Sequence, residues 1–206
     1  MSFVERRGPG TIAVLFGPPG SGKGTQAVHI SDAFHLSHIS TGELLRTEVE
    51  SGSKLGREVG PMMAAGELVP DELIVRVIER RLRQDDSRRG VLLDGFPRTV
   101  PQAQALDAML ERQGRGVDMI ICLDVPRQLL RERILKRALE EGRLDDTADA
   151  IETRFEVYER DTAPVCEHYA MKQKTRKVCV DGVGSVDEVR QRVGIALAEA
   201  LGRNAA

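Results

Sequence analysis

Strong net charge and long apolar runs are both missing from this sequence, and each absence excludes a class of protein. The 206 residues carry a net charge of only -2, which argues against a general binder of nucleic acid or of anionic membranes. No apolar run approaches membrane-spanning length, and the first residues, MSFVERRGPG, lack the apolar stretch of a secretory signal. We therefore expect a cytoplasmic protein that binds neither nucleic acid nor membranes.

Cysteine is scarce as well. Cys122, Cys166 and Cys179 are odd in number and show no C-x-x-C spacing, which suits a reducing compartment and argues against a cysteine-rich structural zinc site. With 41% hydrophobic and 30% charged residues, the chain has the composition of an ordinary globular protein with one buried core.

Short apolar runs alternate with stretches of helical periodicity along the chain. In one such stretch Ile151, Phe155 and Tyr158 are spaced i, i+4, i+7 and predict one apolar helix stripe. Alternating strands and helices predict an α/β fold, a parallel sheet with helices on both faces. We expect strands at 11–16, 36–40, 90–94, 117–125 and 176–182.

The chain shows no internal repeats and no linker, so we expect a single domain over residues 1–206. Two segments read as insertions into the core pattern. Residues 40–69 hold short helical patterns broken by glycines and Pro61, and a brief polar segment surrounds Arg143.

The segment GPPGSGKGTQ, residues 17–26, follows the first apolar run and precedes a predicted helix over about 22–34. It matches the phosphate-binding pattern G-x-x-x-x-G-K-[ST] except that Gly24 takes the hydroxyl position and Thr25 comes one residue late. Backbone N–H groups and a helix N-terminus attract phosphate, and Lys23 would reach the terminal phosphates. The alternative is a glycine-rich turn without ligand. Because the usual Mg²⁺-binding hydroxyl is missing, we expect Mg²⁺ to be held through water and by Asp94.

Five motifs in order, GPPGSGKGTQ, HISTGELLR, GELVPDELIV, LLDGFPRT and GRLDD, resemble those of the adenylate kinases over about residues 11–201. The resemblance implies a P-loop NTPase fold with a five-stranded parallel sheet. It also implies a nucleoside-monophosphate-binding insert at 40–69 and a short lid at 136–146, which lacks the four-ligand zinc site of longer lids.

The activity implied by the resemblance is phosphoryl transfer from Mg·ATP to AMP, giving two ADP, in a nucleoside monophosphate kinase that maintains the balance of adenine nucleotides. Mg²⁺ would be the cofactor, ATP, AMP and ADP the partners, and a monomer the working form. Such a reaction needs several cations to neutralise the transferred group. The residues implied as catalytic are Lys23, Arg98, Arg137, Arg143 and Arg154.

The same resemblance assigns two nucleotide subsites. Arg133 would stack on the ATP adenine, Arg46 and Arg98 would clamp the AMP phosphate, and the Gln102 amide would read a purine edge. The implied ATP-binding residues are Gly20, Ser21, Gly22, Lys23, Gly24, Thr25, Arg133, Arg137 and Gly184. The implied AMP-binding residues are Thr41, Arg46, Met63, Glu67, Leu68, Val69, Gly95, Phe96, Pro97, Arg98, Gln102, Arg143 and Arg154.

Several of these residues also have a purely structural interpretation. Arg133 and Arg137 would equally suit a solvated helix face, Arg143 a solvated loop, and Met63 a core position. We interpret His38 as structural. Five arginines that match no motif are expected on the exposed surface: Arg80, Arg81, Arg83, Arg88 and Arg89.

Other nucleotide-binding proteins remain as alternatives. UMP/CMP kinases share the fold and most motifs, but Thr41 and Gln102 both favour AMP. A switch GTPase or a nucleotide-dependent binding module would also carry a phosphate loop. A switch GTPase, however, would carry N-K-x-D for guanine, and no such tetrapeptide occurs.

Overall fold

The computed structural model of the chain describes residues 10–141 and 147–200. These residues form a five-stranded sheet whose strands coincide with the five predicted apolar runs. The strands are β1 (Thr11–Phe16), β2 (Ser37–Ser40), β3 (Gly90–Asp94), β4 (Met119–Asp124) and β5 (Arg176–Asp181). The longer helices are α1 (Lys23–Phe34), α2 (Thr41–Glu50), α3 (Lys54–Ala65), α4 (Asp71–Leu82), α5 (Val100–Glu111), α6 (Arg127–Glu141), α7 (Ala148–Val157), α8 (Ala163–Ala170) and α9 (Val186–Ala200).

The strands lie in the order β2-β3-β1-β4-β5 and every pairing is parallel. The central strand β1 therefore has its carboxyl end beside the carboxyl ends of β3 and β4, with Leu15 opposite both Asp94 and Ile121. In open parallel sheets ligands bind at this edge. The predicted α/β fold with a parallel sheet is confirmed.

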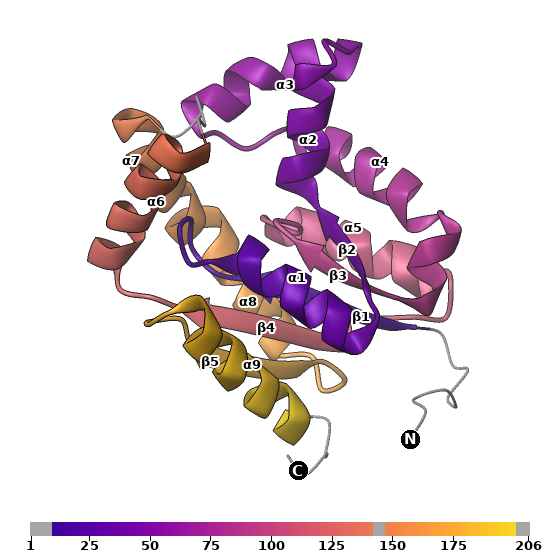
Figure 1. The fold of residues 1–206 in the computed structure, drawn as a ribbon. Helices are drawn as coiled ribbons and strands as arrows, with labels where there is room; N and C mark the ends of the chain where they lie inside the picture. Colours follow the sequence, from indigo (N-terminus) through magenta and orange to yellow (C-terminus); the bar gives the residue numbers. More distant parts are fainter. Residues whose placement is uncertain (1–9, 142–146, 201–206) are drawn as a thin grey trace.

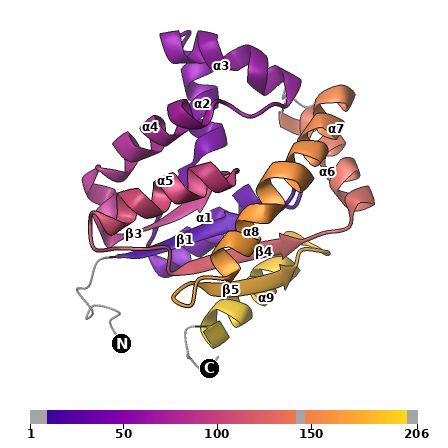
Figure 2. The same ribbon diagram turned by 180° about the vertical axis from the view of Figure 1, so that it is seen from behind.

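Helices cover both faces of the sheet. Helices α1 and α9 lie on one face (Figure 1), and α5 and α8 lie on the other (Figure 2). Each side has its own buried cluster: Ala27, Ile30 and Val193 pack under α1 and α9, whereas Leu106 and Tyr169 belong to the larger cluster on the opposite side. The three central strands β1, β3 and β4 are largely buried from both sides, which explains why their sequences are mostly apolar, whereas the edge strands β2 and β5 are only partly buried and carry polar residues.

The segment between β2 and α4 forms two helices, each with a serine cap. Ser40 accepts a hydrogen bond from the backbone of Glu43, and Ser53 caps α3. The expectation that glycines break this helical pattern is correct at Gly52, between α2 and α3, and at Gly66, which ends α3; it is wrong at Gly56, Gly60 and Pro61, because α3 continues through them. Gly56 instead permits close packing, since a Cβ there would lie 2.0 Å from the carbonyl oxygen of Glu48.

Helices α6 and α7 enclose a small cluster of their own, formed by Leu130, Ile134, Ile151 and Phe155 together with Val125. The predicted stripe is therefore confirmed at Ile151 and Phe155.

Tyr158 departs from the predicted stripe. A π-helical turn, η2 (Tyr158–Thr162), begins there and joins α7 to α8. The change of helical register leaves Tyr158 half-buried, at the edge of the pocket described below.

The surface prediction for the motif-free arginines is correct at Arg80, Arg83, Arg88 and Arg89 and wrong at Arg81. The Arg81 guanidinium is 19% exposed and lies 2.6 Å from the Asp86 carboxylate. Within residues 10–141 and 147–200, none of the helices combines the length and the apolar character needed to cross a membrane.

Candidate functional site

The loop between β1 and α1 lies at the carboxyl edge of the sheet. Gly20 and Gly22 have φ angles of 79° and 86°, a backbone conformation that favours glycine. Helix α1 begins at Lys23, and among the described residues no side chain caps its first turn. The N-terminus of α1 is therefore directed into the loop with its partial positive charge, as an anion site requires.

Lys23 follows this loop as the first residue of α1 and lines the site. Its Nζ donates to the carbonyl oxygen of Pro18, 3.2 Å away. The pKa of Lys23 is lowered to about 8, chiefly by burial, which Asp94 opposes and to which the charges of Arg98, Arg137 and Arg154 add. The ammonium is thus destabilised until negative charge enters the site.

Asp94 closes β3 and is only 7% exposed. Burial alone would raise its pKa, but the contact with His38 and the charges of Lys23, His38 and Arg98 hold the pKa below its usual value. The Nε2 atom of His38 lies 3.6 Å from Asp94 Oδ2. The interpretation of His38 as structural stays a prediction, and the structure places its ring beside this carboxylate.

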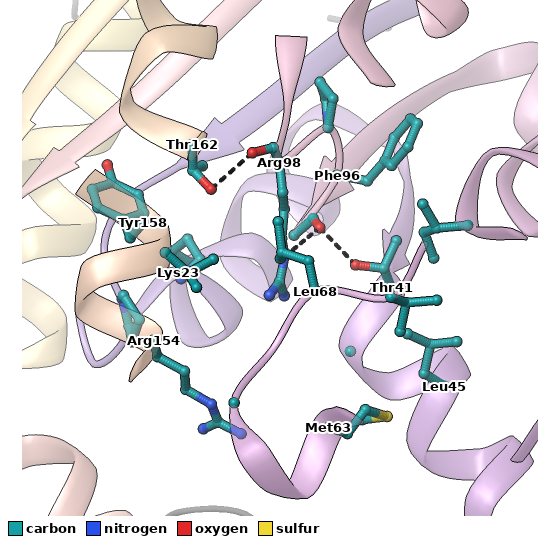
Figure 3. Close-up of a pocket in the computed structure, with 18 of the residues that line it drawn as sticks. Lys23, Thr41, Leu45, Met63, Leu68, Phe96, Arg98, Arg154, Tyr158 and Thr162 are labelled. Atoms are coloured by element: carbon teal, nitrogen blue, oxygen red, sulfur yellow. Dashed lines mark hydrogen bonds between the residues drawn. The ribbon is translucent and has the colours of Figure 1, made fainter. Parts of the chain in front are cut away.

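The carbonyl oxygen of Gly95 links two predicted binding residues. Thr41 Oγ1 donates to it at 2.8 Å, and Arg98 Nε donates to it at 2.8 Å. Thr162 Oγ1, from the turn between α7 and α8, donates to the Arg98 carbonyl oxygen at 3.0 Å. Figure 3 shows these contacts, with Lys23 and Arg154 on the side of the pocket opposite Thr41. Arg98 is thereby held through its side chain by Gly95 and through its backbone by Thr162.

The predicted AMP-binding residues that the structure describes line one pocket between α2, α3, α5 and α7. They are Thr41, Arg46, Met63, Glu67, Leu68, Val69, Gly95, Phe96, Pro97, Arg98, Gln102 and Arg154. Arg143 lies outside the described residues. Met63 meets both interpretations, because it packs against the main core and also lines the pocket.

A second pocket contains the predicted ATP-binding residues. It is lined by Gly20, Ser21, Gly22, Lys23, Gly24, Thr25, Arg133, Arg137 and Gly184, together with Asp94. Arg133 donates to the carbonyl oxygens of Gly182 and Gly184, at 3.1 and 3.3 Å, so its guanidinium lies against the β5–α9 loop. This contact distinguishes Arg133 from a solvated helix-face residue.

Four cations line both pockets: Lys23, Arg46, Arg98 and Arg137. The pKa of Arg98 is lowered, chiefly by burial, with Arg154 and Arg46 adding to the effect against Asp94. The positive charges of the site therefore meet at the junction of the two pockets. Such a junction suits the transfer of a phosphoryl group from one ligand to another.

Several neighbours of the site have no role predicted from the sequence. Tyr158 and Thr162 line the first pocket, and Asp71 lies behind Gln102, 2.6 Å from its Nε2 atom. Asp71 belongs to the motif GELVPDELIV and is an acid at the start of a helix, but neither signal predicts its contact with Gln102.

The three cysteines, far apart in the sequence, also converge. Cys122 and Cys179 are paired in the β4–β5 register, and the Sγ atoms of Cys122 and Cys166 are 3.9 Å apart. All three are free thiols. No spacing in the sequence predicts this cluster.

The donor set around Asp94 suits an ion that arrives with its own ligands. In the described part of the chain, no three His, Cys, Asp or Glu side chains come close enough together to hold a metal. A Cβ at Gly24 would lie 3.8 Å from Asp94 Oδ2, so the missing hydroxyl side chain leaves that approach to the carboxylate open.

Comparison with known proteins identifies the family. Residues 15–174 match the family described as adenylate kinase. An adenylate kinase of Xanthomonas campestris pv. campestris (strain 8004) is 50% identical over 190 residues, which cover 92% of this chain and 98% of that protein. An adenylate kinase of Stenotrophomonas maltophilia (strain K279a) is 46% identical over 180 residues, covering 87% and 95%. The predicted resemblance is confirmed, and the chain belongs to the adenylate kinase family.

Proposed function

We propose that the two pockets are the two nucleotide subsites of the family's reaction, and that the four cations at their junction stabilise the phosphoryl group in transit. The reaction of an adenylate kinase is the reversible transfer of the terminal phosphoryl group of ATP to AMP, which gives two ADP. The chain is accordingly an ATP:AMP phosphotransferase. The observation that carries the residue assignment is that Lys23, Arg46, Arg98 and Arg137 line both pockets.

The donor subsite takes ATP. Its phosphates lie in the loop from Gly20 to Thr25, where backbone N–H groups and the α1 N-terminus complement negative charge. Arg133 stacks on the adenine, and the backbone near Gly184 meets the edge of the base. The hydrogen bonds from Arg133 to Gly182 and Gly184 support this assignment, because they hold the guanidinium beside that backbone.

The acceptor subsite takes AMP. Arg46 and Arg98 bind its phosphate, because guanidinium groups match phosphate oxygens in pairs. Thr41, Met63, Gln102 and the backbone of residues 67–69 surround the base. Thr41 and Gln102 are each 2% exposed, which supports a role in base choice. A base that leaves a buried polar group without a hydrogen-bond partner binds with a less favourable free energy.

Phosphoryl transfer requires the protein to position the two nucleotides and to neutralise the charge of the transferred group; it requires no covalent bond to the protein. Lys23 moves with the charge from donor to acceptor, and Arg137, Arg143 and Arg154 converge on the transferring group. The lowered pKa values of Lys23 and Arg98 support this role, since both cations are destabilised until phosphate enters. No general base is needed, because the AMP phosphate is already a nucleophile.

Asp94 would hold Mg²⁺ through water when the ion is bound together with ATP. The pKa of Asp94 lies below its usual value despite burial, so the side chain is a carboxylate at neutral pH, and Gly24 leaves room beside it. When bound, Mg²⁺ neutralises the phosphate oxygens of the donor nucleotide. The chain carries no structural zinc in this proposal.

The moving parts are the insert at 40–69, with α2 and α3, and the short lid at 136–146, within one domain of residues 1–206. Closure of such segments excludes water and completes the cation set. Arg46 lies on the insert, whereas Arg137 lies on the lid at the end of α6. Residues 142–146, which include Arg143, lie outside the described part of the chain.

We further propose a cytoplasmic monomer that acts on free nucleotides and binds neither nucleic acid nor membranes. Three free thiols suit a reducing compartment, and the net charge of -2 gives no general attraction for polyanions. Light scattering after size-exclusion chromatography tests the monomer; a larger mass would contradict it.

An acceptor panel tests the function. We expect ADP to form rapidly from ATP and AMP in the presence of Mg²⁺, and more slowly with CMP, UMP or GMP as acceptor. Product separation by chromatography measures each rate. A preference for CMP or UMP would replace this proposal with a UMP/CMP kinase, and slow release of phosphate from ATP alone would indicate a nucleotide switch.

A further inference from the structure

The side-chain amide of Gln102 is held at both ends by protein groups. Its Nε2 donates to Asp71 Oδ1 at 2.6 Å, and its Oε1 accepts from the backbone N–H of Arg98 at 2.7 Å. Gln102 is 2% exposed and lines the acceptor pocket. Both hydrogen bonds are short and partly buried, and together they fix the side chain at both ends.

The two partners allow only one orientation of this amide. A carboxylate accepts hydrogen bonds and cannot donate, whereas a backbone N–H donates and cannot accept. Turning the amide over would place Gln102 Oε1 against the Asp71 carboxylate and Nε2 against the Arg98 N–H. Both contacts would then be repulsive, in a site where unpaired polar groups are costly.

One N–H and one oxygen lone pair of the amide remain for a ligand, in a fixed order. A 6-aminopurine presents an acceptor at N1 and a donor at its amino group, which this order can match. A 6-oxopurine such as hypoxanthine or guanine presents the opposite pattern, a donor at N1 and an acceptor at O6. The locked amide can pair with the first base, and would have to turn over to pair with the second.

Asp71 is itself fixed in place. Thr99 Oγ1 donates to Asp71 Oδ2 at 3.0 Å and accepts from the backbone N–H of Gln102 at 3.2 Å. Asp71 is the first residue of α4, where the helix dipole favours a negative charge. The carboxylate is therefore held in one position by groups that do not contact the ligand.

We propose that Asp71 is a positioning residue that locks the Gln102 amide and thereby makes the acceptor subsite select 6-aminopurine over 6-oxopurine monophosphates. The proposal rests on the proposed function, in which Gln102 lies at the base of AMP. Asp71 acts through Gln102 and does not touch the nucleotide. The selectivity for the purine 6-position therefore depends on Asp71, which contacts Gln102 but does not line the pocket.

The test compares AMP with its 6-oxo analogue, IMP, as acceptor. Asp71→Asn replaces the acceptor-only carboxylate by an amide that can turn with Gln102, which removes one of the two repulsive contacts of the flipped state. We expect the ratio of kcat/KM for AMP to that for IMP to fall by about tenfold, mainly through KM. The ratio is independent of the folded fraction, because both acceptors use the same folded molecules.

Two variants serve as controls. Glu72→Gln removes the same charge from the same helix turn at an exposed position, and we expect it to leave the ratio unchanged. Asp71→Glu keeps an acceptor-only carboxylate, and we expect it to retain most of the selectivity. An equal loss of selectivity in Glu72→Gln and Asp71→Asn would assign the effect to helix charge and overturn the proposal.

A double-mutant cycle separates this inference from the proposed function. In a Gln102→Leu background we expect Asp71→Asn to have no further effect on the AMP-to-IMP ratio. If Gln102→Leu lowers the ratio while Asp71→Asn leaves it intact, Asp71 is not a positioning residue and the assignment of Gln102 stands. If Gln102→Leu itself leaves the ratio unchanged, Gln102 does not read the base and both proposals fail.

Discussion

The two proposed subsites of this molecule are lined by different parts of the chain. The donor side includes the glycine-rich loop before α1, whose backbone N–H groups suit phosphate, and Gly24 and Thr25 there are exposed. The acceptor side consists of side chains that other groups hold in place, such as Thr41 on Gly95 and Gln102 on Asp71. Backbone amides read phosphates, which all nucleotides share, whereas fixed side chains read a base. We therefore expect the acceptor side to be the more selective of the two.

The largest effect comes from removing the cation that belongs to both sides. Lys23→Met is expected to lower kcat by ~10²–10³, because the ammonium stabilises charge that develops between the subsites. Steady-state kinetics measure the loss, and circular dichroism and thermal unfolding show whether the fold is retained. Lys174→Met, in an exposed turn, is the matched control. Activity within a few-fold of the parent would remove Lys23 from the mechanism.

A ligand that spans both subsites gives the next largest effect. Two adenosines joined by five phosphates are expected to bind about 10²-fold more tightly than ATP, because the second half binds at a high effective concentration. Calorimetric titration measures the affinities. A shorter analogue with two phosphates cannot span the junction and serves as the control. If the long ligand binds no better than ATP, the two pockets are not adjoining subsites.

The binding of ATP is expected to take up a proton at alkaline pH. The pKa of Lys23 is about 8 in the unliganded protein, and phosphate in the loop raises it. Below pH 8 the lysine is protonated with or without ATP, whereas above pH 8 binding must take up a proton. We expect the association constant for ATP to fall by up to about tenfold per pH unit above pH 8.

Calorimetry in buffers of different ionisation enthalpy measures this uptake. In Lys23→Met the proton uptake and the pH dependence are both expected to disappear. The same slope in that variant would assign the titration to another group.

The smallest effect concerns base choice on the acceptor side. Thr41→Ala is expected to raise the turnover of CMP or UMP relative to AMP by about fivefold, the equivalent of ~1 kcal/mol for one buried hydroxyl hydrogen bond. Kinetics with the three acceptors test this ratio, and Thr47→Ala, exposed on the same helix, is the control. An unchanged ratio would leave base selection to Gln102 and the backbone of residues 67–69.

The donor side could be predicted from the sequence more fully than the acceptor side. The residues that form a phosphate loop are close together in the sequence, so the strand, the glycines and the start of the helix can all be predicted from residues 11–34. The central strands are also local signals, because a strand buried on both faces is mostly apolar, whereas the edge strands β2 and β5 are partly exposed and give a weaker signal. These predictions are confirmed, whereas the individual roles of the binding residues stay predictions.

The contacts that hold the acceptor side join residues far apart in the sequence. Asp71 meets Gln102 across 31 positions, and Thr162 meets Arg98 across 64. No periodicity encodes such pairs, which arise only when α4, α5 and the turn before α8 pack together. The error at Pro61 has a related cause: local propensity opposes a helix there, but Val59 is fully buried and Met63 packs on the core, so tertiary contacts retain α3.

The shared carbonyl oxygen of Gly95 has a consequence for redesign. One oxygen atom holds both Thr41, which we propose lies by the base, and Arg98, which we propose binds the phosphate. The two halves of acceptor recognition are therefore not modular: a substitution that moves this peptide disturbs both together. An engineer who wishes to exchange one base for another while keeping catalytic speed has to leave Gly95 alone and work from the layer behind it, at Gln102 and its neighbours.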